Sequence, residues 1–404
     1  MGNEVEKIEL SDMAALYKKQ LFEIMEEWAA HTIDDVNGGY ITDFGDEWKL
    51  ISLRKNIWAQ ARQTYMFAAY YEYSGKQEKW LGLAKVGRDF LVTNAYAGDG
   101  RWNYEVSEDG KSIIEGTTTI FTDLFALIAL SEYSYVSGDK TDLPLIQQTF
   151  ERVEKNLRDP YFKDIKPHVW REEIDRHSPY MIAIHSSMVA EQVLGSDITR
   201  PFIKFCIDKL LNFFGANESG FLLESLKRDG HVWDTKEGRI VNPGHILEGM
   251  WFCIDYARKI SDERIIEQAL KIIRKTAEAA VDTEYGGVIH RFDCWNQQED
   301  DMVETDTGAL KADYKVDWVN CESLYAFALA AVLLKDKESI ECFLKQHQFC
   351  QRYFRPAEGG DWYPVLDKNG TPVRKNKGGM HRVAFHVPRA LMNISRLLEI
   401  EMAF

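Results

Sequence analysis

Cysteine is scarce in this sequence, and the spacing of the cysteines argues against both a disulfide framework and a zinc site. No two cysteines form the CxxC pair that structural zinc sites and thiol redox motifs use. Most of them fall in apolar patterns typical of helices, where a free thiol behaves as a small hydrophobic side chain. We therefore predict no disulfide framework and no zinc site. The six positions are Cys206, Cys253, Cys294, Cys321, Cys342 and Cys350.

Positive charge is also in short supply. The chain carries 49 Lys and Arg against 64 Asp and Glu, which gives a formal net charge of −15. A nucleic-acid-binding protein neutralises phosphates with a Lys/Arg-rich surface, and this composition does not supply one in bulk. We therefore predict no nucleic-acid partner and favour a neutral or small substrate.

Long apolar runs and nucleotide-binding glycine loops are missing as well. The first ten residues, MGNEVEKIEL, have no basic segment followed by an apolar core. No stretch approaches the ~20 apolar residues that a membrane helix needs. Neither a P-loop nor a Rossmann glycine pattern occurs. We expect a cytoplasmic protein that does not bind a membrane.

The remaining composition is that of a chain with a large core. Apolar residues make up 45% and charged residues 28% of the 404 residues, which are ordinary values for a globular protein. This length fits two or three average domains or one closed architecture. The internal organisation of the chain has to decide between them.

Glycine-containing turns return along the chain at intervals of roughly sixty to seventy residues, as in repeat architectures. One interval has double length, and we place a weaker unit at residues 159–161 within it. Three units close with an Asp-Gly or Asn-Gly pair, which favours the positive φ of tight hairpin turns. We predict a short β-hairpin at the same point of each repeat. The glycines are Gly39, Gly100, Gly220, Gly287 and Gly360, and the pairs are Asp109-Gly110, Asp229-Gly230 and Asn369-Gly370.

Twelve segments with apolar residues at i, i+3, i+4 and i+7 lie between these turns, two in each repeat. Six helical hairpins of this kind close into an all-α (α/α)6 barrel with the β-hairpins at one rim, so we predict a single catalytic domain over residues 1–404. An open α-solenoid is the alternative, but closure buries the ends that a solenoid has to cap. The segments are 10–31, 55–74, 78–94, 118–137, 143–158, 179–195, 199–214, 243–260, 264–281, 316–335, 337–353 and 388–401.

The stretch NPGHILEGMW opens one of the predicted inner helices with residues suited to proton transfer. Asn242 is a good N-cap and Pro243 fits the first turn. His245 and Glu248 then lie one turn apart on one side, which Trp251 extends. The positive end of the helix dipole disfavours the imidazolium, and a general base needs the neutral ring. The alternative is a hydrogen-bonding role for the histidine and a core role for the tryptophan.

Three further helices carry similar combinations. His386 precedes Pro388 in the stretch FHVPR, so a second inner helix begins with an adjacent His and Pro. Trp58 and Arg62, and likewise Trp318 and Glu322, are spaced i, i+4, which places an aromatic face beside a charged head as in sugar-binding sites. The alternative is a core tryptophan with a buried Arg–Glu pair.

Two further assignments follow from the same helices. His185 lies in the helix over 179–195 and is placed to reach the same pocket, although a capping or core role is the favoured alternative. The HxxE pair of His245 and Glu248 resembles half of a carboxylate-bridged metal site. No convergent repeat of that pair occurs in the sequence, so we predict no metal.

Five motifs in this order resemble the N-acylglucosamine 2-epimerase family, which includes cellobiose 2-epimerases and aldose–ketose isomerases. They cover nearly the whole chain, and the family fold is the (α/α)6 barrel. The motifs are KxxWxQxR at 55–62, NPGHxxExxW at 242–251, WxxxE at 318–322, GGxWY at 359–363 and KGGxxxxxFHVPR at 377–389.

The resemblance implies proton transfer without a cofactor. His245 and His386 match two family histidines on opposite sides of C2 of an open-chain sugar, where one removes the proton and the other returns it. Arg62 matches the arginine that stabilises the oxyanion at O1. Glu248 and Glu322 match carboxylates that orient the histidines or assist ring opening, and the former is the expected partner of His245.

The aromatic residues bear on the substrate. By the resemblance, Trp251 and Trp318 pack against the sugar, and Trp362 stacks on a second sugar ring as in the disaccharide enzymes. Trp58 is a substrate-binding candidate from its spacing with Arg62. FHVPR resembles the N-acylglucosamine branch instead. Met188 departs from the family, which tends to have Asn or His three residues before the glutamate at position 191.

We predict a sugar 2-epimerase that interconverts N-acetylglucosamine and N-acetylmannosamine or a related hexose pair. A disaccharide 2-epimerase and an aldose–ketose isomerase are the alternatives, followed by a glycoside hydrolase with Glu248 and Glu322 as its acid and base. The expected partner is a small sugar, and the oligomeric state stays open, with a homodimer among the options.

Overall fold

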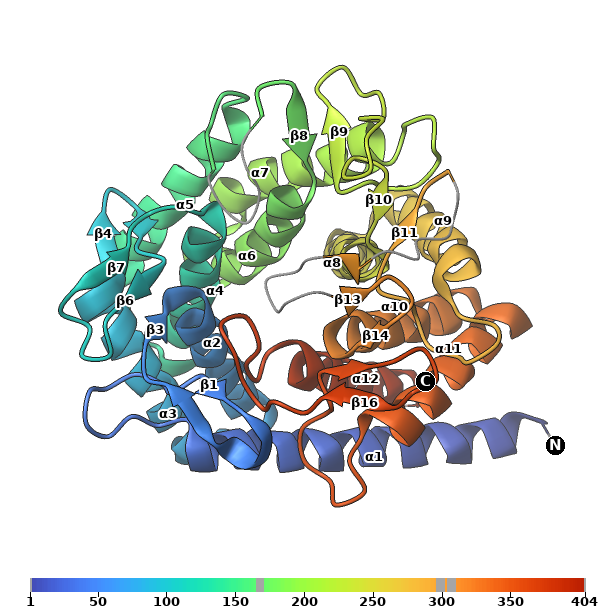
Figure 1. Cartoon of the computed structure of the whole chain (residues 1–404), viewed down its shortest axis with the longest axis horizontal. Coiled ribbons are helices and arrows are strands. Elements are labelled where there is room, and N and C mark those ends of the chain that lie inside the picture. Colours follow the sequence, from blue (N-terminus) through green and yellow to red (C-terminus); the bar gives the residue numbers. More distant parts are fainter. Residues whose placement is uncertain (1, 165–170, 296–301, 304–309, 403–404) are drawn as a thin grey trace.

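The computed structural model describes residues 2–164, 171–295, 302–303 and 310–402. Within them, twelve α-helices form two concentric rings, the predicted (α/α)6 barrel (Figure 1). The inner helices are α2 (Ile57–Tyr73), α4 (Ile120–Ser137), α6 (Ser178–Leu194), α8 (Pro243–Ile260), α10 (Asp317–Leu334) and α12 (His386–Met402). The outer helices are α1 (Gly2–His31), α3 (Glu78–Phe90), α5 (Leu143–Arg158), α7 (Ser196–Asp208), α9 (Glu263–Ala280) and α11 (Lys337–Phe349).

Contacts between consecutive even-numbered helices close the inner ring, from α2 on α4 round to α12 on α2. Each outer helix packs mainly against one inner helix, and α3, α5 and α9 also contact the following one. Helix α1 packs against α12, so the two ends of the chain complete the ring (Figure 1). The inner helices are buried on all sides, which explains why some of them are apolar around the whole circumference. One of them, α10, is long and apolar enough to cross a membrane by length and composition alone, and 78% of it is buried in the fold.

The predicted helices agree with the structure, with local differences at their ends. The first helix begins at Gly2 instead of residue 10. Three outer helices continue as π turns at Leu91–Ala95, Lys209–Phe214 and Cys350–Phe354, close to where the sequence pattern ends. The last helix begins at His386, so this histidine is the first helical residue instead of a flanking one.

Short antiparallel strands form one rim of the barrel, as the Asp-Gly and Asn-Gly pairs predict. Gly110, Gly230 and Gly370 all have a positive φ in the three predicted turns. The sheets are β1 (Asp43–Phe44) with β2 (Leu50–Ser52); β3 (Lys55–Asn56), β6 (Glu105–Val106) and β7 (Ile113–Glu115); β4 (Tyr96–Gly98) with β5 (Arg101–Trp102); β8 (Ile174–Arg176) with β9 (Ser225–Lys227); β10 (Ile240–Val241) with β11 (Phe292–Asp293); β12 (Met302–Val303) with β13 (Leu310–Lys311); and β14 (Lys315–Val316), β15 (Val365–Leu366) and β16 (Pro372–Arg374).

The rim fixes where the inner helices begin. Strands β3, β8, β10 and β14 each end within two residues of the start of α2, α6, α8 and α10. Asn242 caps α8 as predicted, since its side chain accepts a hydrogen bond from the backbone N–H of His245. The first turns of the inner helices therefore meet at the end of the barrel that carries the rim.

Candidate active site

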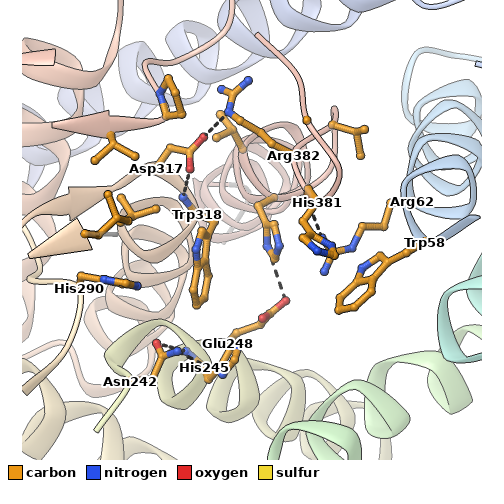
Figure 2. Close-up of a pocket in the computed structure, with 18 of the residues that line it drawn as sticks. Trp58, Arg62, Asn242, His245, Glu248, His290, Asp317, Trp318, His381 and Arg382 are labelled. Carbon is orange, nitrogen blue, oxygen red and sulfur yellow. Dashed lines mark hydrogen bonds and ion pairs between the residues drawn. The ribbon is translucent and has the colours of Figure 1, made fainter. Parts of the chain in front are cut away.

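A cavity of about 260 Å³ lies where the inner helices begin. Six of the predicted site residues line it: Trp58, Arg62, His245, Glu248, Trp318 and His386. Figure 2 shows Trp58 and Arg62 on one side of the cavity, and His245 and Trp318 on another. Rim residues complete the wall, among them His290, Arg291, Leu310, Asp361, Arg374, Asn376, His381 and Arg382.

His245 is held by a carboxylate, but not by the predicted one. Its Nδ1 lies 2.6 Å from Glu224 Oε1 and 3.3 Å from Asn242 Nδ2. The expectation that Glu248 is its partner is therefore wrong. An ionised carboxylate at Nδ1 favours a proton on that nitrogen, which leaves Nε2 to exchange protons with a bound molecule.

His386 on α12 is held in the same way by a carboxylate of the neighbouring inner helix, α10. Its Nδ1 lies 2.7 Å from Glu322 Oε1 and 3.8 Å from Glu248 Oε1. Glu248, the predicted partner of His245, is therefore a neighbour of His386. Both histidines line the cavity with Nδ1 bound to a carboxylate, which leaves Nε2 of each ring for contact with a bound molecule.

The surroundings shift the pKa values of the two histidines in opposite directions. Burial lowers the pKa of His245, but the charge and hydrogen bond of Glu224 outweigh it, so the pKa is raised. Burial lowers the pKa of His386 well below its usual range, and Arg62 and Arg389 add to this against the attraction of Glu248. Two groups driven apart in this way are suited to act as a proton donor and a proton acceptor.

Arg62 is the buried cation that faces the cavity. Its guanidinium donates to the backbone carbonyl of His381 at 3.1 Å and lies over the rings of Trp58, Phe125 and Phe385. Within the described part of the chain, no carboxylate lies within ion-pair distance of it. Burial lowers its pKa to about 9, which leaves it charged at neutral pH. An anionic oxygen in the cavity would find an unneutralised guanidinium here.

Arg389 joins the two predicted glutamates. It is 1% exposed, and its Nη2 lies 2.6 Å from Glu322 Oε1 and also contacts Glu248 Oε1. Glu322 further accepts a hydrogen bond from the indole of Trp251 at 2.8 Å and does not line the cavity. These contacts disfavour the hydrolase alternative, because neither carboxylate is a free acid or base.

Trp318 separates the two histidines at the cavity wall. Its ring centroid is 5.1 Å from that of His245 and 5.6 Å from that of His386. The ring lies so close to the start of α8 that a Cβ on Gly244 would come within 2.4 Å of it. The glycine of the NPGH stretch is therefore required by the tryptophan that packs over it.

An apolar wall lies opposite, built from α4 and α6. Phe121 and Phe125 both stack on Trp58 with ring centroids 5.2 Å apart, and Met181 and Ile182 continue the wall. Met188, which departs from the family pattern, is not among the lining residues. The residues of α6 that line the cavity lie nearer the start of the helix and are Ser178, Met181 and Ile182.

Three predicted substrate-binding residues lie outside the cavity lining. Trp251 is buried against Glu322, and His185 stacks on Phe252 with ring centroids 4.6 Å apart. Trp362 is 1% exposed and stacks on Phe354, in the core beside the outer helices. The predicted stacking of Trp362 on a second sugar ring is therefore wrong, because its ring is already covered by protein.

Several site residues escaped the sequence analysis. Glu224 lies just before β9 with no motif around it, and Arg389 belongs to the quoted FHVPR stretch but had no assigned role. His381 lines the cavity with its ring centroid 4.7 Å from that of Trp58. Arg382 anchors the same loop through Asp317 and Asp361 (Figure 2). An acidic residue in a run of apolar ones, FLLES, is the one signal that pointed to Glu224.

Comparisons with known proteins agree with this geometry. The family model of N-acylglucosamine 2-epimerase (GlcNAc 2-epimerase) matches residues 39–390. The chain is 24% identical to the N-acylglucosamine 2-epimerase of Mus musculus, over 94% of this chain and 90% of that one. It is 24% identical to the cellobiose 2-epimerase of Eubacterium cellulosolvens, over 94% and 97%. The crystal structure of a sugar epimerase from a ruminal bacterium superposes with a TM-score of 0.81 at 20% identity, over 95% and 98% of the two chains.

The match covers the five motifs and most of the chain, and the fold and the histidine-lined cavity agree with it. The protein therefore belongs to the N-acylglucosamine 2-epimerase family of carbohydrate epimerases.

Proposed function

We propose that this protein interconverts N-acetylglucosamine and N-acetylmannosamine by moving a proton at C2 of the open-chain sugar. One observation carries the proposal: His245 and His386 line the same cavity, and each is held at Nδ1 by a separate carboxylate. Inversion at carbon requires a proton acceptor on one face and a proton donor on the other. Two independently supported imidazoles meet that requirement.

The reaction follows from the surroundings of each group. Nε2 of one histidine takes the C2 proton, which the adjacent aldehyde acidifies, and the electrons of the C–H bond move into an enolate whose negative charge lies on the oxygen at C1. Arg62 stabilises the negative oxygen at C1, since its guanidinium is buried and lacks a carboxylate partner within the described residues. The other histidine then donates its proton to the opposite face of C2. In the reverse direction the two exchange roles.

The apolar wall supports an N-acyl sugar. Phe121, Phe125, Met181 and Ile182 offer surface that matches the methyl group of an acetamide and gives a hydroxyl no hydrogen bond. Trp362, the aromatic expected for a second sugar ring, is buried in the core. Both features favour an N-acetylated monosaccharide over a disaccharide.

The test is turnover in deuterated water with N-acetylglucosamine, mannose, glucose and cellobiose in parallel. We expect N-acetylmannosamine to form from N-acetylglucosamine with deuterium at C2. Proton NMR measures this as loss of the C2 proton signal in the product. Product that keeps its proton at C2 would contradict the mechanism. A ketose as the main product would identify an isomerase, and faster turnover of cellobiose would identify a disaccharide epimerase.

Replacing Glu224 by Gln tests how His245 is supported. The amide keeps an acceptor at Nδ1 but removes the charge that raises the pKa of His245, so that pKa should fall. We expect kcat/KM to fall about 100-fold in both directions, with KM little changed. Because less imidazolium remains at neutral pH, the limb of the pH–rate profile that reports this group should move to lower pH.

The matched control is Glu218→Gln, which removes a half-exposed carboxylate beside His231. It should change neither the rate nor the pH profile. An unshifted profile in the Glu224→Gln enzyme would show that this carboxylate does not set the protonation of His245.

A further inference from the structure

A cluster of potential metal ligands includes His245 and two residues that do not line the cavity. His177, Glu224 and His245 bring one ligand atom each to within 4.8 Å of one another. The first of them is 1% exposed and is not among the residues that line the cavity. The sequence predicted no metal, because the HxxE pair of His245 and Glu248 has no convergent repeat, and neither His177 nor Glu224 belongs to such a pair.

His177 is oriented as a metal ligand is. Its Nδ1 lies 2.9 Å from the carbonyl oxygen of Leu223, and since a carbonyl only accepts, this nitrogen carries the proton. Nε2 is then a bare lone pair, buried and without a hydrogen-bond partner among the described residues. It lies 4.0 Å from Glu224 Oε1. Histidines that bind metals typically donate the other ring N–H to a carbonyl or carboxylate in this way.

The backbone holds the cluster on regular structure. His177 directly follows β8 and caps α6, and Glu224 directly precedes β9. These two strands are paired through Arg176 and Ser225, and the N–H of His177 donates to the carbonyl of Glu224 at 3.2 Å. His245 comes from the first turn of α8. The three side chains are thus placed by a strand pair and two helix starts.

We propose that His177, Glu224 and His245 form a binding site for a divalent transition-metal cation, with Zn²⁺ as the best fit. Two imidazoles and one carboxylate are a ligand set that zinc uses with a water in the fourth position. Bonds of about 2.0–2.2 Å place tetrahedral ligands about 3.3 Å apart. The 4.0 Å separation of His177 Nε2 and Glu224 Oε1 has to shorten and the 2.6 Å separation at His245 has to open, each by less than about 1 Å.

The other cluster of donors near the cavity is a poorer site. Glu248, Glu322 and His386 also bring their ligand atoms together. The guanidinium of Arg389 already contacts both carboxylates, and it also lies 3.4 Å from Nδ1 of the histidine. A cation there would meet a buried positive charge.

Occupancy of this site would inhibit the reaction proposed above. Zn²⁺ would take the lone pair of His245 Nδ1, so the neutral ring would carry its one proton on Nε2 instead of Nδ1. A ring protonated at Nε2 cannot accept the proton from C2. This consequence rests on the proposed function, whereas the binding itself does not.

Zn²⁺ binding to the metal-free protein is measured by calorimetry, and Co²⁺ is used as a spectroscopic probe. We expect one tight site per chain and a tetrahedral Co²⁺ absorption spectrum. His177→Phe should weaken binding at least about tenfold and remove the spectrum, since losing a direct ligand costs no less than losing an outer-shell partner. Glu224→Gln should have the same effect and provides the test if His177→Phe does not fold. A thermal melt of each variant shows whether it is folded.

The control is His231→Asn, which removes an imidazole from an exposed His–Glu pair with Glu218. It should leave the tight site intact. Unchanged Zn²⁺ affinity in folded His177→Phe and Glu224→Gln proteins would overturn the proposal, as would the absence of a stoichiometric site. Binding without any loss of epimerase activity would retain the site but count against the role of His245 as a proton carrier.

Discussion

His386→Asn should abolish epimerisation while leaving proton exchange in one of the two epimers. The remaining His245 reaches only one face of C2, so it removes and returns the proton on that face without inversion. We expect the epimerisation rate to fall roughly 10²- to 10⁴-fold, the loss expected for a positioned general acid or base. In deuterated water, NMR should show deuterium entering one epimer only.

His245→Asn should give the mirror-image result, with deuterium entering the other epimer. Asparagine can still accept or donate a hydrogen bond at either site, so the comparison isolates proton transfer. The exposed His231→Asn variant should retain both exchange and epimerisation. If either histidine variant exchanged both epimers, a single group would serve both faces and the two-histidine mechanism would be wrong.

The fold could be predicted from the sequence because its signals are local. The outer helices carry clear apolar periodicity, the inner ones are long apolar segments, and several begin with Asn or Pro, as at Asn242 and Pro243. The Asp-Gly and Asn-Gly turns mark hairpins without reference to distant residues. A repeat of helical hairpins then leaves few closed arrangements, of which the barrel is one.

The candidate site could be predicted only in part, because the sequence does not show how far along an inner helix the cavity reaches. The inner helices are buried on all sides, so periodicity does not show which side chains reach the cavity. Only the first two turns do so, which places His245 and Trp318 in the wall. Trp251 and His185 lie further along their helices and are enclosed by protein instead.

The partners of the histidines could not be predicted for a different reason. Glu224 contacts His245 from 21 positions away in the chain, and Arg389 contacts Glu248 from 141 positions away. The sequence offered Glu248 as the partner of His245 because they share a helix face. The structure instead directs this carboxylate across the ring to Arg389 on α12. Closure of the ring decides that pairing.

Arg389→Met should cost more stability than any surface substitution. The guanidinium is buried with Glu248 and Glu322, so its removal leaves two carboxylates close together with less compensation. Breaking a buried ion pair from one side destabilises a protein by about 3–5 kcal/mol. The loss should be visible in the midpoint of urea unfolding. Arg264→Met, which removes an exposed arginine paired with Asp262, should change stability by less than about 0.5 kcal/mol.

A second substitution distinguishes charge from packing. Adding Glu248→Gln to Arg389→Met should recover part of the loss, because one of the uncompensated charges is removed. A double variant no more stable than Arg389→Met would mean that Arg389 acts through packing against Trp251 and Phe385 alone.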